Sequence, residues 1–371
     1  MSNPTPANLA DLTCVPVPLT GHAYNVYFGA NILAQLPEAL NALFPERRYS
    51  KILIVSDQNV ATHYLADLEK AFAGGPVVTL TCPAGESSKS FDTLALLCSA
   101  MAGHRLDRKS LVIALGGGVI GDLAGLAAAI YMRGLEYVQV PTTIVSQVDS
   151  AVGGKTGINL PAGKNLIGAF HHPCLVWADV MTLATLPERA YFEGWAEVIK
   201  HGCIRDRSML DQLITLEQKP GPQLIPTLAR NVEIKAQIVA ADEKETTGLR
   251  ALLNFGHTVG HALEQLAGYG KLLHGEAVSL GMVVALAISQ RRGAISKAEQ
   301  ALVLKLLERW RLPTRLEVPL DLSALSNIMA LDKKFESGAI RYVLLGALGD
   351  GELVDDVTWS ELQEVIDSQL G

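Results

Sequence analysis

The sequence lacks the features that mark several broad classes of protein. Its five cysteines form no CxxC pair and no even-numbered framework, which suits a reducing cytosol. The net charge of −7 argues against nucleic acid or an anionic membrane as the main partner. No basic segment followed by an apolar run opens the chain, so no signal peptide is evident, and the longest apolar run, at 277–288, is too short to span a bilayer. We therefore expect a cytoplasmic protein.

What the sequence does contain is enough apolar material for more than one core. Hydrophobic residues make up 49% and charged residues 19% of the 371 positions, which excludes a disordered chain and predicts a well-packed globular one. The length favours two domains. We place the boundary at about residue 180, giving domains over 1–180 and 181–371.

The two halves differ in their apolar pattern. Residues 51–56, 76–80 and 111–115 read as buried strands, and helical stretches separate them. From about Thr182 nearly everything has helical period, with one further strand expected at 341–345. The sequence therefore predicts a Rossmann-like parallel-sheet α/β domain followed by a mostly α-helical domain.

A glycine-rich turn over 116–121 joins the third predicted strand to a helix. Glycines at such a turn let the backbone approach a diphosphate, whose charge the helix N-terminus stabilises. The spacing is not GxGxxG, and a tight turn that needs only small residues is the alternative interpretation. Polar or flexible residues follow the other predicted strands too, and ligands of open α/β sheets bind beyond the carboxyl ends of strands. We expect one shared rim from Asp57, Glu86, Lys89, Gly118, Asp122, Thr142 and Thr143.

A lysine-bearing loop follows over 146–170. It carries Asp149, Lys155, Lys164 and Asn165 among glycines and apolar residues, a setting that suits a small, multiply anionic substrate. Other cations interrupt apolar segments elsewhere, which indicates a phosphate or carboxylate ligand; these are Arg133, Lys200, Arg250 and Lys333.

Three histidines fall within eighteen residues and suggest a metal centre. His257 and His261 are spaced i and i+4 on a predicted helix, and His274 follows thirteen residues later. Glu197 lies in an otherwise apolar helical segment and would supply the carboxylate of a His₂Glu site. The spacing leaves open whether both His257 and His261 are ligands or one of them is a hydrogen-bonding partner.

Taken together, these motifs resemble the 3-dehydroquinate synthase family of the sugar phosphate cyclase superfamily. The resemblance runs from about Asp57 to Gly349. It is carried by the ordered segments 116–122, 139–143, 146–150, 153–159, 163–170, 196–200, 249–257, 274–278 and 332–334.

The resemblance implies three sets of site residues. Zinc, or cobalt in its place, would be held by Glu197, His257 and His274. NAD would be held by Asp57, Asn59, Glu86, Lys89, Gly117, Gly118, Val119, Ile120, Gly121, Asp122, Thr142, Thr143, Lys155, Lys164, Thr182, Leu183 and Thr185. Substrate and catalytic contacts would come from Arg133, Asp149, Lys155, Lys164, Asn165, Lys200, Lys235, Arg250, Asn254, His261 and Lys333.

The reaction implied is the conversion of 3-deoxy-D-arabino-heptulosonate 7-phosphate to 3-dehydroquinate and phosphate, a step of the shikimate pathway to chorismate and the aromatic amino acids. It combines transient oxidation by NAD, phosphate elimination, re-reduction and an intramolecular aldol closure. Such an enzyme is a carbon–oxygen lyase, and the resemblance suggests a homodimer.

The chain departs from the family pattern in three places, and two other functions compete. Leu160 stands where a polar residue is common, His201 where tyrosine is commoner, and the 242–248 turn is one residue longer, which affects the placement of Lys235. The competing enzymes are another sugar phosphate cyclase, or a metal- and NAD-dependent polyol or glycerol-phosphate dehydrogenase; a non-catalytic NAD- or metal-binding module is a further alternative, which so many polar residues in apolar settings disfavour. Retention of Asp149, Lys155, Asn165 and His261 favours the synthase.

Overall fold

The computed structural model describes residues 9–268, 270–317, 324–330, 335–336 and 339–370. The chain divides into two compact units, one of residues 1–186 with 219–240 and the other of 187–218 with 241–371. The segment 219–240 thus packs with the first unit, whereas the boundary predicted near residue 180 placed it in the second domain. Within the described ranges no helix has the length and apolar character that a membrane crossing requires.

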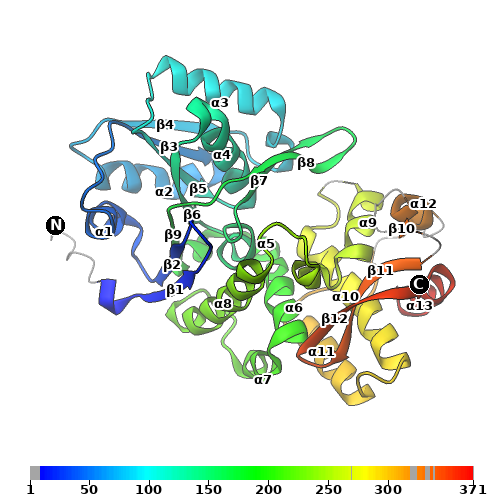
Figure 1. Cartoon of the computed structure of the whole chain (residues 1–371). Helices are drawn as coiled ribbons and strands as arrows, with labels where there is room; N and C mark the ends of the chain where they lie inside the picture. The colour runs from blue at the N-terminus through cyan, green and yellow to red at the C-terminus, as the bar shows by residue number, and fades with distance from the viewer. Residues whose placement is uncertain (1–8, 269, 318–323, 331–334, 337–338, 371) are drawn as a thin grey trace. The chain divides into compact units, whose positions relative to one another are not determined.

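The first unit is built on a seven-stranded sheet (Figure 1), in the order β1-β2-β9-β6-β5-β3-β4. All neighbours pair in parallel except β1 and β2, which are antiparallel. The strands are β1 (Thr13–Val17), β2 (Tyr24–Gly29), β3 (Ile52–Asp57), β4 (Val77–Cys82), β5 (Leu111–Gly116), β6 (Glu136–Pro141) and β9 (Leu175–Asp179). The three strands predicted from apolar runs are confirmed as β3, β4 and β5.

Helices cover both faces of this sheet because its central strands are apolar on both sides. In β5, Leu111, Ile113 and Leu115 belong to one hydrophobic core and Val112 and Ala114 to the other, as the two-residue repeat of a strand requires. The helices are α1 (Leu36–Leu43), α2 (Gln58–Ala71), α3 (Phe91–Gly103), α4 (Gly118–Ile130) and α8 (Ile225–Ala241). Short helical turns cover Leu9–Asp11, Leu33–Gln35, Glu86–Ser88, Tyr131–Arg133, Ser146–Ser150, Val180–Thr185 and Pro222–Leu224.

The lysine-bearing segment is largely a β-hairpin and not a loop as predicted. Strands β7 (Lys155–Leu160) and β8 (Gly163–Phe170) pair antiparallel. The hairpin lies close to α4: a Cβ at Gly125 would come within 2.6 Å of the Thr156 side chain. Thr156 and Ile158 are buried there, whereas Leu166 and Phe170 on β8 are exposed.

The second unit is mostly helical, as predicted, with a small antiparallel sheet in the order β10-β11-β12. The predicted strand at 341–345 is the middle of β11. Sequence reasoning missed β12 because its acidic residues conceal the alternation of a half-exposed strand. The elements are α5 (Glu188–Glu193), α6 (Trp195–Arg205), α7 (Arg207–Thr215), the turn Leu249–Asn254, α9 (His257–Ala267), α10 (His274–Arg291), α11 (Lys297–Arg309), α12 (Leu325–Ala330), β10 (Phe335–Glu336), β11 (Ala339–Ala347), β12 (Asp350–Thr358) and α13 (Trp359–Leu370).

Candidate metal centre and cofactor site

Glycines let α9 and α10 approach each other closely in the second unit. A Cβ at Gly281 would lie 1.8 Å from the carbonyl oxygen of Gly256, and one at Gly260 would lie 2.9 Å from that of Ala277. Gly256 itself has φ of +79°, in the left-handed region that favours glycine. This backbone contact fixes the start of α9, where His257 is the first residue, against α10.

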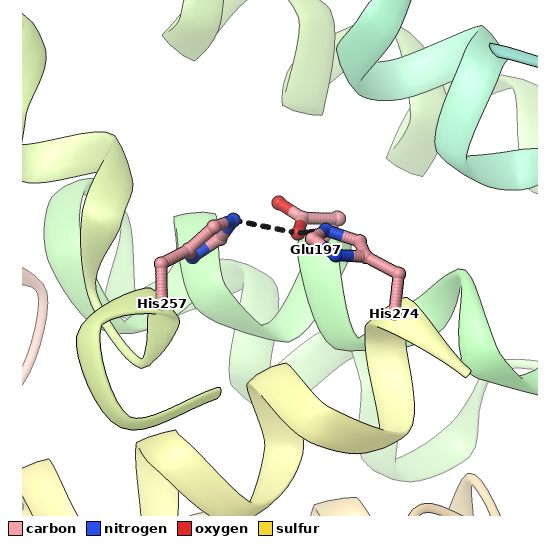
Figure 2. A group of neighbouring side chains, drawn as sticks. All are labelled: Glu197, His257 and His274. Atoms are coloured by element: carbon pink, nitrogen blue, oxygen red, sulfur yellow. Dashed lines mark ion pairs between the residues drawn. The ribbon is translucent and has the colours of Figure 1, made fainter. Parts of the chain in front are cut away.

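The first residues of α9 and α10 and the first turn of α6 bring three potential ligands together (Figure 2). The Nε2 atoms of His257 and His274 lie 3.4 and 3.3 Å from Oε1 of Glu197. One donor atom from each of the three side chains lies within 4.8 Å of the others. Glu197 is completely buried and His257 nearly so.

The other ring nitrogen of each histidine faces an acceptor of the protein. Nδ1 of His257 lies 3.1 Å from the carbonyl oxygen of Phe255, and Nδ1 of His274 lies 3.6 Å from Oε2 of Glu264. With Nδ1 protonated and engaged in this way, Nε2 of each ring is the atom available to a metal. Sequence reasoning missed Glu264, although its position seven residues after His257 places it on the same helix face.

The charges around Glu197 favour its carboxylate form. Burial opposes ionisation, but Lys200, His257 and His274 outweigh it and hold the pKa of Glu197 well below its usual range. Burial and the Lys200 ammonium lower the pKa of His257. For His274 burial acts in the same direction, yet Glu197 and Glu264 overcome it and raise the pKa to about 10.

This arrangement fits a divalent transition metal. Lys200 forms an ion pair with Oε2 of the buried Glu197, and the Nε2 atoms of His257 and His274 face Oε1. Two imidazoles and one carboxylate that converge in this way are a donor set that suits zinc. Glu197, His257 and His274 could therefore hold a metal ion.

His261 stands apart from this group. Its ring centroid lies 5.2 Å from that of His257 and 5.9 Å from that of His274, but its nitrogens are outside the set of mutually close donor atoms. The i, i+4 spacing correctly placed His257 and His261 beside each other, and the fold joins His257 with His274 instead. His261 is largely exposed, so its ring is accessible to a small molecule.

The N-terminal turn that carries His274 is braced from two sides. Glu276 accepts from the backbone nitrogen of Leu273 and forms a two-pronged ion pair with Arg189 at 2.6 Å. Glu193 at the end of α5 accepts from the backbone nitrogen of Gly275, and a Cβ at Gly275 would lie 1.8 Å from the carbonyl oxygen of Glu193. These contacts fix the direction in which His274 leaves the helix.

In the first unit, the predicted rim follows the carboxyl ends of the parallel strands. Asp57 ends β3 and caps α2 by accepting from the backbone nitrogens of Asn59 and Val60. The first residues of α4 follow β5, and no side chain caps this helix, so its first backbone N–H groups remain available to an anion.

The glycines of the turn at 116–121 also have a packing role. A Cβ at Gly118 would lie 2.9 Å from the Ser150 hydroxyl, and one at Gly121 would lie 2.5 Å from Oε1 of Gln139. Gly117 would meet Thr143 at 3.0 Å. The tight-turn and phosphate-binding interpretations are thus compatible, because the same small residues serve close packing and leave the backbone accessible.

Lys89 is the centre of a polar network that joins the rim to the hairpin. Its ammonium is nearly buried and donates to Asp122 at 2.6 Å and to Asn165, with Glu86 3.8 Å away. Asn159 links Glu86 to Asn165, because its side-chain amide donates to Glu86 and its side-chain oxygen accepts from the backbone nitrogen of Asn165, both at 2.8 Å. Burial raises the pKa of Asp122, and Lys89 acts against this rise.

The threonines expected at the cofactor site are held by the sheet's neighbouring turns. Thr142 is buried, and its hydroxyl has no hydrogen-bond partner among the described residues. Tyr64 of α2 donates to the carbonyl oxygen of Thr182 and shares a hydrogen bond with the Thr185 hydroxyl, at 3.0 and 2.7 Å. Leu183 lies in the core between them.

Two further predicted residues meet in the first unit. Nζ of Lys235 on α8 donates to the carbonyl oxygen and Oδ1 of Asp149, at 2.6 and 2.7 Å. The longer turn at 242–248 had left the position of Lys235 open. The contact with Asp149 places it firmly beside the segment that leads into the hairpin.

The remaining residues predicted to contact the substrate lie in several elements of both units. Arg250 of the second unit is buried and bonded to Glu243 and Glu245, with Asn254 one turn later. Lys155 and Lys164 lie on the hairpin. Arg133 is exposed at the far end of α4, which begins at the carboxyl end of β5, so it lies away from the rim of its own unit. Lys333 falls outside the described residues.

Comparison with known proteins places these motifs in one family. Models of the 3-dehydroquinate synthase N-terminal and C-terminal regions match residues 79–193 and 194–335. The chain belongs to the 3-dehydroquinate synthase family. It is 42% identical to the 3-dehydroquinate synthase of Thermosynechococcus vestitus over 95% of this chain and 98% of that relative. The corresponding figures for Symbiobacterium thermophilum are 47%, 90% and 94%.

A solved structure of a related enzyme supports the fold assignment. The 2-epi-5-epi-valiolone synthase of Streptomyces hygroscopicus subsp. jinggangensis 5008, solved with NAD⁺ and Zn²⁺, is 30% identical to this chain. The TM-score is 0.84, over 95% of this chain and 98% of the other. The family resemblance and the fold class predicted from the sequence are thereby confirmed. The roles of individual residues stay predictions.

Proposed function

We propose that this chain is a 3-dehydroquinate synthase that uses NAD and a divalent metal, zinc or cobalt. Its substrate would be 3-deoxy-D-arabino-heptulosonate 7-phosphate, and its products 3-dehydroquinate and phosphate. The observation that supports this most is the convergence of Glu197, His257 and His274 in a chain that is 42–47% identical to 3-dehydroquinate synthases over most of its length.

Each cofactor has a set of residues suited to it. Glu197, His257 and His274 would hold the metal, and the rim from Asp57 to Thr185 would hold NAD, with the open N-terminus of α4 facing its diphosphate. When bound, the metal supplies polarisation of a substrate hydroxyl and NAD supplies a hydride acceptor that later returns the hydride.

The chain's own residues would bind the substrate's charges and manage its protons. Lys155, Lys164 and Asn165 on the hairpin suit the phosphate, and Arg250 suits a carboxylate because its guanidinium is held rigidly by Glu243 and Glu245. Lys200 would stabilise negative charge beside Glu197. His261 is exposed, so its ring can reach a bound substrate and transfer a proton to or from it.

Phosphate release with a limiting amount of NAD tests this function. The metallated enzyme is incubated with heptulosonate phosphate and NAD below the enzyme concentration, and phosphate and NADH are followed together. Many phosphates released per NAD, without net NADH, are expected. Stoichiometric NADH from a polyol would instead support a dehydrogenase, and turnover of a different heptulose phosphate another cyclase. Zinc and NAD binding without any turnover would refute the enzymatic proposal.

We further propose that the enzyme works as a homodimer in the cytoplasm. Arg133 is exposed at the end of α4 opposite to the rim of its own unit, a position that suits a contact with the site of another copy. Exposed apolar side chains lie close to it in sequence and on the hairpin, a composition typical of an interface: Ile130, Met132, Leu166 and Phe170.

Subunit complementation tests this arrangement. Arg133→Ala and Lys200→Ala are each expected to be nearly inactive. An equal mixture allowed to exchange subunits should recover up to about a quarter of wild-type activity. About half of its dimers are then mixed, and each mixed dimer has one intact site out of two. Sedimentation of the wild type as a monomer, or no recovery in a demonstrated mixed dimer, would contradict the proposal.

A further inference from the structure

We propose that Glu264 is a positioning residue of the metal centre, which acts on the ion through the ring of His274. The inference rests on the proposed metal site. It assigns to the Glu264 carboxylate the tasks of fixing the Nδ1–H tautomer of His274 and of directing Nε2 toward Glu197.

Helical spacing places Glu264 beneath the histidines. It lies seven residues after His257 and three after His261 on α9, so all three project from one side of that helix. From there its Oε2 lies 3.6 Å from Nδ1 of His274, while Nε2 of the same ring lies 3.3 Å from Oε1 of Glu197. The imidazole is thus held between two carboxylates, one at each nitrogen.

The two histidines differ in how they are supported. The side chain of His257 is 10% exposed, and its Nδ1 faces a backbone carbonyl of its own segment, that of Phe255. The side chain of His274 is 33% exposed, and the acceptor that its Nδ1 faces comes from the other helix. The acceptor at Nδ1 is therefore a side chain of the neighbouring helix for His274 and a carbonyl group of the local backbone for His257.

The burial of Glu264 supports a specific role. Its side chain is 10% exposed, and a carboxylate in such a position is unfavourable unless a cationic or donor group accompanies it. A carboxylate on the outer nitrogen of a ligating histidine raises the basicity of the ring and holds its orientation, and loss of such a partner typically weakens metal binding about 10–100-fold.

Metal affinity of the full-length protein provides the test. Zinc dissociation constants are measured by competition with a chromophoric chelator for the wild type, Glu264→Gln, Glu264→Asp and Glu299→Gln. Glu299 is the control, because its carboxylate, at the start of α11 in the same unit, accepts from the backbone nitrogen of Ser296 and not from an imidazole. Circular dichroism of each apo-protein establishes that the variant is folded.

Glu264→Gln should bind zinc about 10–100-fold more weakly than the wild type, with Glu264→Asp in between and Glu299→Gln within about threefold of the wild type. The visible absorption of the Co²⁺-loaded protein should also shift in Glu264→Gln, because the orientation of one ligand ring changes. Equal weakening in Glu299→Gln, or a zinc affinity and cobalt spectrum of Glu264→Gln that match the wild type, would overturn the inference. A wild type that binds no zinc would overturn the metal site itself.

Discussion

Two groups of buried charges differ in what surrounds them. The first unit contains the rim network of Lys89, Asp122, Asn165 and Glu86, and the second unit contains the metal cluster of Glu197, His257 and His274. In the rim network, the nearly buried ammonium of Lys89 is surrounded by the oxygens of Asp122, Asn165 and Glu86. In the metal cluster, the completely buried Glu197 carboxylate faces the Lys200 ammonium with one oxygen and the Nε2 atoms of His257 and His274 with the other.

This difference separates two uses of buried charge. The rim network closes its hydrogen bonds with the protein's own side chains, so it stabilises the fold whether or not a ligand is bound. The metal cluster directs two imidazole nitrogens and one carboxylate oxygen toward one another, an arrangement that a cation can occupy. Substitutions in the rim network should therefore change the free energy of unfolding, and those in the metal cluster should change ligand affinity.

The largest effect is expected for His274→Ala. Loss of one of three protein ligands should weaken zinc binding on the order of 1,000-fold, and the rise in melting temperature that zinc gives the wild type should disappear. Zinc content after dialysis and thermal melts with and without zinc measure both. Exposed His104 provides the control His104→Ala, and full zinc occupancy in His274→Ala would refute the ligand assignment.

Gly281→Ala tests whether the metal cluster depends on the close approach of α9 and α10. The added Cβ would lie 1.8 Å from the carbonyl oxygen of Gly256, so the helices must separate, at a cost of about 3 kcal/mol in the free energy of unfolding. Urea denaturation measures it.

Gly103→Ala is the matched control for this comparison. Gly103 ends α3, and no atom lies within 4 Å of a Cβ built there. Its replacement should change the free energy of unfolding by no more than about 0.5 kcal/mol. Equal effects of the two substitutions would show that the approach of the helices does not constrain residue 281.

Lys89→Met addresses the rim network in the absence of any ligand. It leaves Asp122 without its ammonium partner, and because the Asp122 side chain is 19% exposed, we expect a loss of about 2 kcal/mol. Denaturation of NAD-free protein measures this loss, and the double variant Lys89→Met/Asp122→Asn should recover part of it. An unchanged unfolding free energy would place the network among groups that matter only when NAD is bound.

The smallest effect concerns Asp242, another satisfied carboxylate. Backbone N–H groups of Thr247, Arg250 and Thr246 lower its pKa to about 2, from 3.8. A depressed pKa in the folded state stabilises the fold above about pH 4 and ceases to do so as the pH falls toward 2. Asp242→Asn should thus melt below the wild type at about pH 6, with the gap closing below pH 4. A gap independent of pH would exclude this charge effect.

The sequence predicted the parts of the fold in which one residue pattern dominates. Strands such as Leu111–Gly116 are apolar at every position, which only a sheet covered on both faces accommodates. The hairpin and β12 were missed, since a half-exposed strand mixes polar and apolar residues in a pattern that the sequence shares with loops. The packing of segment 219–240 with the first unit likewise depends on contacts distant in sequence.

Residue types and their order determined by themselves the family, the parallel sheet and the set of side chains capable of chemistry. Spacing alone did not determine the grouping of those side chains; the family resemblance implied Glu197, His257 and His274 as one set, and the fold brings these three together. Spacing along one helix brings His257 near His261, but glycine contacts between α9 and α10 place His257 opposite His274 and Glu197, and set Glu264 behind His274. Only the tertiary structure decides such a grouping, because it depends on how closely two backbones approach, and no local pattern encodes that distance.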